Sequence, residues 1–512
     1  MFKNADKHIL TIVLLYVLLQ IFYLIAEYQI TGHQFGVPLD DTWIHFRFAE
    51  NFAAGHFFEY NIGEPTPGTT SPLWIIILSI PFLFSHALAL PYALILGSVF
   101  FLLSLIELYK HCIKLGFDSV YSLFITVITM LCGRLLWSAL SGMEITLFCY
   151  LSILIFRNHL SEIESGKLTV ANGLFLGIAA NTRPETYLLA GIYYISSVIL
   201  LRKNIKQNIN NLLLSALIFI VLIIPYPIFC YVYTGKFLPS TYEGQVGTVK
   251  FLPDFKYLVE TGKLFVKDNL LIVFLWFTSM GYFIYTLLTK KADKKFLMIN
   301  LWVILLPAVS SIAAPNWRHH GRYLIPLIPF INIISIYILR KIHIYIQSKE
   351  FKKYNLLRKI SIALVLIFSL NSTVVFANAL GWNVENINNQ QVKTANWLKI
   401  SLPDEKAFGM NDIGAITFIT KKYVVDMAGL VTPEVFQFQK LSYEDGAREL
   451  FKLLKSKDVN YIIIYPEWYE YIMENYSVAL EQVYSAKLEK NTISGGIEMF
   501  VYKINWDSLN LN

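Results

Sequence analysis

Two adjacent carboxylates, Asp40 and Asp41, follow the first hydrophobic stretch of the chain and open the helix-like segment DDTWIHFRFAENFAAG, with Gly55 at its expected end. A carboxylate beside a membrane is able to take the proton of an attacking hydroxyl, a role worth about 10² to 10⁴ in rate. Asp is also a preferred helix cap and complements the helix dipole. Both roles stay open, because capping occupies only one carboxylate oxygen.

Two further polar residues lie on the same predicted helix. His45 is one turn from Asp41 and is able to contact it. Arg47 is about 10 Å along the axis from the first Asp, so it either pairs with Glu50 or Asn51 on a wet helix face or contacts a substrate. We take His45 and Arg47 as candidate substrate-binding residues.

Three later motifs add charged residues. SGME places Glu144 at the edge of an apolar run, where it either caps the helix or joins Asp41 as a second acid or metal ligand. NTRPE places Arg183 and Glu185, both candidate substrate-binding residues, between two short apolar runs. Arg183 there either pairs with Glu185 or a neighbouring carboxylate, or holds a phosphate. NWRHHGRYLIPLIP carries four potential cations that bind phosphate or anchor the edge of a span, namely Arg318, His319, His320 and Arg322.

No resident metal or cofactor is predicted. Adjacent histidines seldom point at one metal, and no HxxxH motif accompanies them. The four cysteines form no CxxC pair and lack metal-ligand spacing. A divalent cation stays an option, because Asp40, Asp41 and Glu144 offer enough oxygen atoms for a loosely held Mg²⁺ or Mn²⁺.

The elements that carry these residues belong to a membrane protein. Of the 512 residues, 55% are apolar and 15% are charged, too few polar groups for the surface of a soluble chain of this length. The net charge of +7 indicates Lys and Arg beside membrane spans, not nucleic-acid binding. About eleven transmembrane helices are expected, near residues 8–27, 88–109, 118–134, 143–157, 169–181, 186–201, 209–230, 269–288, 295–313, 323–340 and 358–378.

Lys and Arg divide unevenly between alternate loops, about twenty against about ten. This asymmetry predicts a cytoplasmic N-terminus and places everything after residue 379 outside, together with the candidate site residues. A span at the apolar segment 73–84 would invert the charge pattern, so we expect an interfacial or re-entrant helix there.

Two domains are expected. The first is a membrane domain over residues 1–380, with its first outer loop at 31–72. The second covers residues 381–512 and alternates helix-like QQVKTANWLKI and YEDGARELFKLLKSK with strand-like YVVDM, YIIIY and EMFVYKI. This pattern predicts a small α/β domain outside the membrane.

The motifs together resemble those of bacterial GT-C glycosyltransferases, particularly relatives of the mycobacterial terminal arabinofuranosyltransferase. The resemblance runs in matching order from residue 40 to about residue 435. Its motifs are DDTWIHFRFAENFAAGHFFEYNIGEPTPGTTSPLW, SGME, NTRPE, YTGKFLPST, RYLIPLIP and VVDMAGLVTPEV.

The resemblance implies a polyprenyl-phosphate sugar donor and an inverting transfer at the outer face of a bacterial plasma membrane. The acceptor would be a hydroxyl of a cell-envelope glycan, a lipid or a protein. Carried over to this chain, Asp40 is the general base, Asp41 orients the base or the acceptor, and Arg183 and Arg322 contact the donor phosphate. Ser240 stands where the resemblance predicts Asn.

Two other functions use similar chemistry. A polysaccharide polymerase or ligase would transfer whole oligosaccharides from the same lipid carriers, and the product mass separates it from a single-sugar transferase. A transporter of lipid-linked sugars would need polar groups near the middle of the membrane. The predicted spans are almost free of ionisable groups, which argues against transport.

Overall fold

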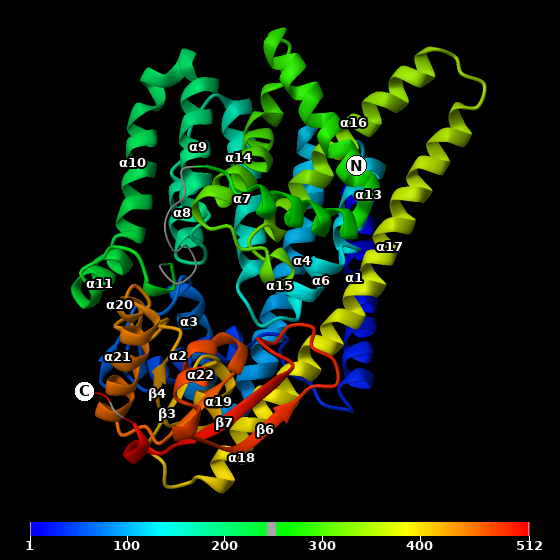
Figure 1. The fold of residues 1–512 in the computed structure, drawn as a ribbon. Helices are drawn as coiled ribbons and strands as arrows, with labels where there is room; N and C mark the ends of the chain where they lie inside the picture. The colour runs from blue at the N-terminus through cyan, green and yellow to red at the C-terminus, as the bar shows by residue number, and fades with distance from the viewer. Residues whose placement is uncertain (1, 243–251, 510, 512) are drawn as a thin grey trace. The chain divides into compact units, whose positions relative to one another are not determined.

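The computed structural model describes residues 2–242, 252–509 and 511, and the chain divides into two compact units (Figure 1). The helical unit comprises Met1–Ile25, Leu94–Ile224 and Thr248–Asn378. The mixed unit comprises Ala26–Ala93, Pro225–Gly247 and Ala379–Asn512. Each unit is assembled from segments far apart in the sequence, and residue 380, the expected domain boundary, lies inside the long helix α17 (Tyr354–Ile387).

The helical unit consists of helices, most of them apolar. Within it, α8 packs against α9 and α10, and α16 packs against α5, α13 and α14. Besides α17, the helices are α1 (Phe2–Ile30), α4 (Ala89–Leu115), α5 (Ser119–Met130), α6 (Gly133–Ala139), α7 (Ile145–Ser165), α8 (Ala171–Ala180), α9 (Thr186–Leu200), α10 (Ile205–Ile223), α13 (Phe255–Leu288), α14 (Leu297–Ala313), α15 (Arg318–Gly321) and α16 (Ile328–Ser348).

The chain is a polytopic membrane protein with fewer long spans than the sequence predicts. Among the described residues, seven helices are long and apolar enough to cross a membrane, or eight if the bent pair α5 and α6 counts as one span. The expected count of eleven exceeds this number partly because α8 and α9 have only 10 and 15 residues. At 1.5 Å per residue they reach about 15 and about 22 Å, less than the roughly 30 Å hydrocarbon core.

The segment expected at 73–84 is also short. It forms α3 (Pro72–Ser79) followed by a 3₁₀ turn (Ile80–Leu83), and it belongs to the shorter apolar helices, not to the spans. A proline at its start suits the first turn of a helix, because proline lacks the N–H that would be unpaired there.

A five-stranded sheet organises the mixed unit, with strand order β4-β3-β5-β7-β6. β3 pairs in parallel with β4 and β5, whereas β7 pairs antiparallel with β5 and β6. The strands are β3 (Ala407–Met410), β4 (Tyr423–Asp426), β5 (Tyr461–Ile464), β6 (Leu480–Lys487) and β7 (Glu498–Ile504). The predicted strand-like runs form β4, β5 and β7, so the α/β nature of the C-terminal domain is confirmed.

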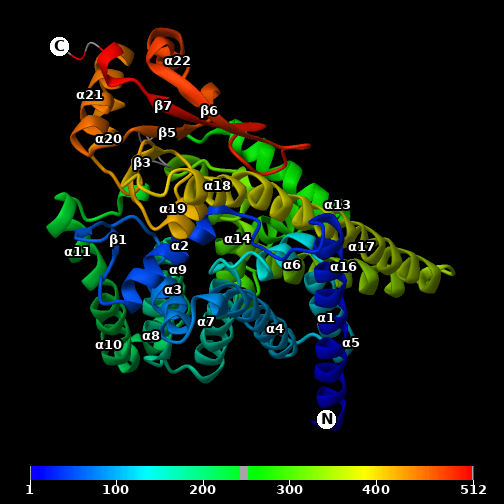
Figure 2. The same ribbon diagram turned by 90° about the horizontal axis from the view of Figure 1, so that it is seen from below.

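Helices cover both faces of this sheet. Figure 2 shows α20 (Val435–Phe438), α21 (Tyr443–Ser456) and α22 (Glu470–Asn475) on one side, and α18 (Lys393–Ser401) and α19 (Gly414–Thr420) on the other. The remaining elements of this unit are α2 (Asp40–Ala53), β1 (Glu59–Asn61), β2 (Glu64–Pro65), α3 and α11 (Pro225–Thr234).

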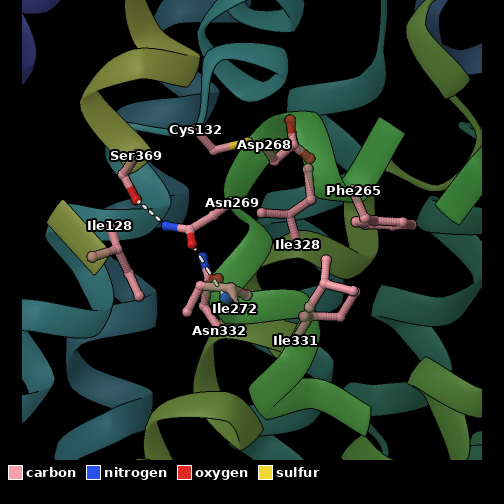
Figure 3. Close-up of a pocket in the computed structure, with 11 residues that line it drawn as sticks. Ile128, Cys132, Phe265, Asp268, Asn269, Ile272, Ile328, Ile331, Asn332 and Ser369 are labelled. Atoms are coloured by element: carbon pink, nitrogen blue, oxygen red, sulfur yellow. Dashed lines mark hydrogen bonds between the residues drawn. The ribbon is translucent and has the colours of Figure 1, made fainter. Parts of the chain in front are cut away.

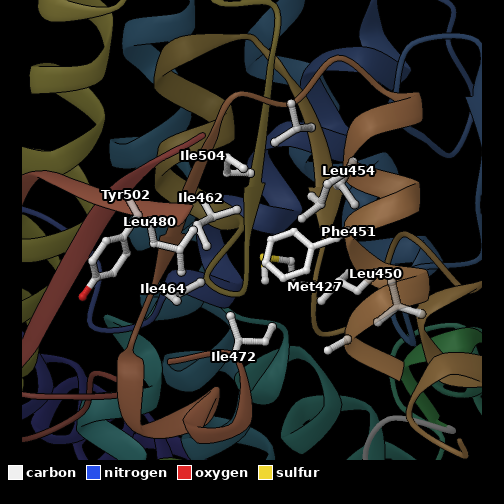
Figure 4. Packing of buried hydrophobic residues seen from close by; sticks show 14 of the residues in the cluster. Met427, Leu450, Phe451, Leu454, Ile462, Ile464, Ile472, Leu480, Tyr502 and Ile504 are labelled. Atoms are coloured by element: carbon white, nitrogen blue, oxygen red, sulfur yellow. The ribbon is translucent and has the colours of Figure 1, made fainter. Parts of the chain in front are cut away.

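The main core of the C-terminal domain lies between α21 and the sheet (Figure 4). Leu450, Phe451 and Leu454 lie on one face of α21, at the i, i+1 and i+4 positions of its apolar stripe, and pack against Ile462 and Ile464 of β5. Burying side chains of this size contributes about 1.5–3 kcal/mol each. This core fixes the strand ends from which the polar residues described next emerge.

Candidate active site

Asp40 and Asp41 occupy the first turn of α2, but neither caps that helix. Its N-cap is Leu39, without a side-chain hydrogen bond, so the capping alternative is not observed in this helix; both carboxylates lie in its first turn, where negative charge complements the helix dipole. The Asp40 carboxylate instead accepts the backbone N–H groups of Gly414 and Ala415 at 2.7 and 2.8 Å. These are first-turn donors of α19, which have no partner inside their own helix.

The two helices approach closely at this point. A Cβ atom at residue 414 would lie 2.2 Å from the carbonyl oxygen of Asp40, so only glycine fits there. Tyr60 reinforces the contact by donating its hydroxyl to the carbonyl of Ile413 at 2.7 Å. The chain thus holds the acidic pair of its first loop against the loop that follows β3.

A third carboxylate, Asp412, lies in that same loop. Its side chain accepts hydrogen bonds from the Gln391 amide and the Tyr465 hydroxyl, both at 2.8 Å. Gln390 also lies 2.8 Å from the Tyr465 hydroxyl. Both glutamines come from a π-helical turn (Asn388–Val392), a rare element that frequently marks functional sites.

The sheet topology explains why these groups converge. Asp412 follows β3, Asp426 ends β4 and Tyr465 follows β5, and these three strands are parallel neighbours. Because β4 and β5 flank β3 on opposite sides, the strand order reverses there, and ligands of open α/β sheets bind at the carboxyl ends of strands beside such a reversal. Sequence reasoning missed Asp412, although NDIG after a short apolar run was an available signal.

The acidic groups shift one another's titration. Burial and then the charge of Asp412 raise the pKa of Asp40 to about 8, against the two backbone hydrogen bonds that lower it. Burial raises the pKa of Asp412, and the nearby charge of Asp41 adds to the increase. A carboxyl with a pKa near the working pH is suited to general base catalysis, because it exchanges its proton readily.

The other predicted residues of α2 have structural partners. Arg47 is buried and pairs with Glu50 at 3.1 Å, while Glu50 also accepts from His86 and Lys421. His45 is partly buried on the same helix. The pairing option for Arg47 is therefore observed.

The loop after α2 is ordered by a distant segment of the mixed unit. Ser240 donates two hydrogen bonds to the carbonyl of Pro67, one from its backbone N–H at 3.1 Å and one from its hydroxyl at 3.2 Å. Tyr226 donates its hydroxyl to the carbonyl of Thr69 at 2.6 Å. Ser240, the departure from the expected Asn, thus serves to hold the Gly- and Pro-rich loop.

In the helical unit, Arg183 joins Glu144 and Glu185. Its guanidinium lies 2.7 Å from a carboxylate oxygen of each, and all three side chains are buried. Glu144 is the N-cap residue of α7 but makes no side-chain cap, so the capping alternative for this residue is not observed. Arg183 and Arg322 both lie over the ring of Tyr323, at 5.2 and 5.3 Å from its centroid.

Replacing Arg183 by Met should leave two buried carboxylates without their cation. We expect a loss of about 3–5 kcal/mol of stability, since breaking a buried ion pair leaves an uncompensated charge. Thermal unfolding in detergent measures it. Arg448→Met is the matched control, because Arg448 pairs with the exposed Glu444 and Asp445 on the solvent-facing side of α21. Equal losses in the two variants would contradict a special role for Arg183.

The predicted cation cluster lies at α15. Arg318 is exposed and Arg322 is buried, and His319 and His320 both have positive φ angles, 51° and 58°. Such backbone strain costs about 1–3 kcal/mol per residue and clusters at functional sites. The His320 ring packs edge-on against Trp137 and Phe376.

A buried ion pair that sequence reasoning missed supports this segment. Arg134 is fully buried, forms a bidentate pair with Asp268 and donates to the carbonyl of His320 at 3.1 Å. Next to it, Asn269 interrupts α13 and bonds to Ser369 at 2.9 Å (Figure 3). The small cavity beside them, about 20 Å³, has room for roughly one water molecule.

No metal site is evident in the described part of the chain: no three or more His, Cys, Asp or Glu side chains group there as they would around an ion. Asp40, Asp41 and Glu144 are therefore not grouped as the metal ligands considered from the sequence.

Comparisons with known proteins identify the fold. A family model described as a domain of unknown function, DUF8728, matches residues 385–502. No curated protein sequence matches the chain. Among solved structures, ArnT from Cupriavidus metallidurans bound to undecaprenyl phosphate is similar with a TM-score of 0.60 and 13% identity, over 96% of this chain and 97% of ArnT.

The oligosaccharyltransferase of Archaeoglobus fulgidus is also similar. Its apo form gives a TM-score of 0.59 with 11% identity, over 98% of this chain and 75% of the other. Its complex with an inhibitory peptide and a dolichol phosphate gives 0.57 with 10% identity over the same shares. The chain therefore has a GT-C-like membrane fold; the relation to arabinofuranosyltransferases stays a prediction.

Proposed function

We propose that the chain is an inverting glycosyltransferase that moves a single sugar from a polyprenyl-phosphate donor to a hydroxyl acceptor at the outer face of a bacterial plasma membrane. The observation that carries this proposal is the cluster of Asp40, Asp41 and Asp412. It lies in a fold shared with proteins solved with undecaprenyl phosphate and dolichol phosphate.

In the proposed reaction, the acceptor hydroxyl attacks the anomeric carbon while its proton passes to Asp40. The new glycosidic bond forms as the bond from that carbon to the phosphate oxygen breaks, and polyprenyl phosphate leaves with the bonding electrons. A single displacement inverts the anomeric centre, whereas retention would need a second, nucleophilic carboxylate. Each Asp40 oxygen accepts one backbone N–H and keeps a further lone pair for the proton.

The donor phosphate is assigned to the cations of the segment Arg318–Arg322. Cationic side chains stabilise the charge that grows on a leaving phosphate. Arg322 is the main candidate, because it is buried and the sequence resemblance assigns it to the donor phosphate. Arg183 pairs with two carboxylates. We assign Arg183 to positioning Tyr323, which both arginines contact.

The test is product formation by the purified full-length protein in lipid nanodiscs. A panel of polyprenyl-phosphate sugars is offered with cell-envelope glycan, lipid and peptide acceptors, and products are analysed by mass and anomeric configuration. One donor should add one sugar unit with inversion. Failure of every donor, with the protein folded by thermal unfolding, would contradict the proposal.

The similarity to an oligosaccharyltransferase favours a second candidate. In that case the product would grow by a whole oligosaccharide in one step. The same mass measurement separates the two, because single transfer adds one residue mass per turnover.

A further inference from the structure

An open groove lies on the C-terminal domain, apart from the carboxylate cluster. It has a volume of about 670 Å³, within the range of roughly 300–1,000 Å³ typical of ligand sites. One wall comes from α20 and the start of α21, and the other from residues 467–474 after β5. The groove is thus built at the carboxyl ends of β4 and β5, where open α/β sheets bind ligands.

Aromatic rings dominate the walls of the groove. Tyr443 is 84% exposed and Trp468 is 48% exposed, and Tyr443 stacks on Tyr471 with ring planes only 22° apart. The Trp468 indole nitrogen donates to the carbonyl of Gly495 at 3.2 Å, so its ring is held in place before any ligand arrives. Exposed apolar groups gathered in this way mark an interaction site.

The charged groups that line the groove are all acidic. Glu467, Glu470 and Glu474 line it together with Gln439 and Ser442, and the described lining residues include no Lys or Arg. A phosphate or an anionic lipid headgroup would therefore be repelled. Sugar rings have apolar C–H faces that pack on aromatic rings, and hydroxyl donors that suit carboxylate and amide acceptors.

The groove is connected to the acidic cluster through two aromatic residues. Trp468 packs against Tyr465 with ring centroids 5.5 Å apart, and Tyr465 bonds to Asp412. Tyr469, which lines the groove, lies near enough to Asp426 and Asp412 that their charges, after burial, raise its pKa. The groove is thus linked to Asp412, one member of the carboxylate cluster, through Trp468 and Tyr465.

We infer that this groove binds the acceptor as an uncharged glycan chain and presents one of its hydroxyls to Asp40. The inference rests on the proposed glycosyltransferase function. It names the acceptor as carbohydrate, where the sequence left glycan, lipid and protein open. Trp468 and Tyr443 are the stacking platforms.

The first experiment measures binding without any donor. Full-length protein in nanodiscs is applied to an array of neutral bacterial envelope oligosaccharides, with oligolysine and polyprenyl phosphate as alternative probes. Wild type should retain at least one glycan. Trp468→Ala and Tyr443→Ala should each weaken its binding about 10- to 30-fold, the loss expected when an aromatic side chain that packs on the ligand is removed. Trp397→Ala is the matched control, because Trp397 stacks on Tyr484 in the same domain but does not line the groove.

Three results would overturn the inference: retention of no glycan, retention of oligolysine alone, or equal binding by wild type and both groove variants. The second experiment uses the donor found active above. Trp468→Ala should raise the acceptor KM with the donor KM and kcat unchanged. Glycan binding without sugar transfer would reject the proposed function but keep the groove as a glycan-binding site. Transfer by Trp468→Ala with an unchanged acceptor KM would reject only the role of the groove in acceptor binding.

Discussion

Asp40→Asn should lower sugar transfer by about 10² to 10⁴, because an amide cannot take the acceptor proton. Asp41→Asn should retain more activity, since we assign Asp41 to orienting the base or the acceptor. The measurement is initial rate with the active donor for both variants and for Asp404→Asn, an exposed Asp-to-Asn control in the same domain. Only the first variant should approach the background rate.

Stability has to be measured alongside activity. In Asp40→Asn an NH₂ group takes the place of one of the two oxygens that accept the N–H groups of Gly414 and Ala415. The lost hydrogen bond costs about 1–3 kcal/mol of stability. Rates are therefore compared well below the melting temperature of each variant. Normal transfer by a folded Asp40→Asn protein would reject the assignment of Asp40 as the base.

Asp412→Asn should shift the pH dependence of transfer instead of abolishing it. With the pKa of Asp40 at about 8, the base is protonated below this pH, so kcat/KM of wild type should rise with pH through about 8. Removing the neighbouring negative charge lowers the pKa of Asp40, and we expect the rising limb to move about one unit toward lower pH. If the pH profile of kcat/KM keeps its position, whatever the absolute rate of the variant, Asp412 acts only structurally.

The same variant should change how stability depends on pH. The unfolded chain loses the Asp40 proton near its ordinary pKa of about 3.9, whereas the folded protein keeps it up to about 8. Folded wild type therefore loses stability as pH rises between these values. Asp412→Asn should reduce this loss, so its melting temperature should improve relative to wild type from about pH 5 to about pH 9. Asp404→Asn should follow wild type at both pH values.

Much of the local structure could be predicted from the sequence. The apolar windows became helices, and the alternating runs became β4, β5 and β7, because hydrophobic periodicity is a local property of neighbouring residues. The helix beginning at Asp40 was also predicted with its end near Gly55, where φ is +91°. The number of spans was not predicted correctly, since an apolar window does not fix how long its helix will be.

The sequence by itself determined a polytopic membrane protein with an acidic pair after its first span and an α/β domain at its end. Only the tertiary structure decided the partners of the charged groups. Asp40 holds the start of α19, Asp412 joins it, and Arg183 is neutralised by Glu144 and Glu185. The approach of Asp40 and Asp412 depends on which strand ends and loops, hundreds of residues apart, the sheet order brings together. The pair of Arg183 and Glu144 depends on how helices pack, and no local pattern of residues encodes either arrangement.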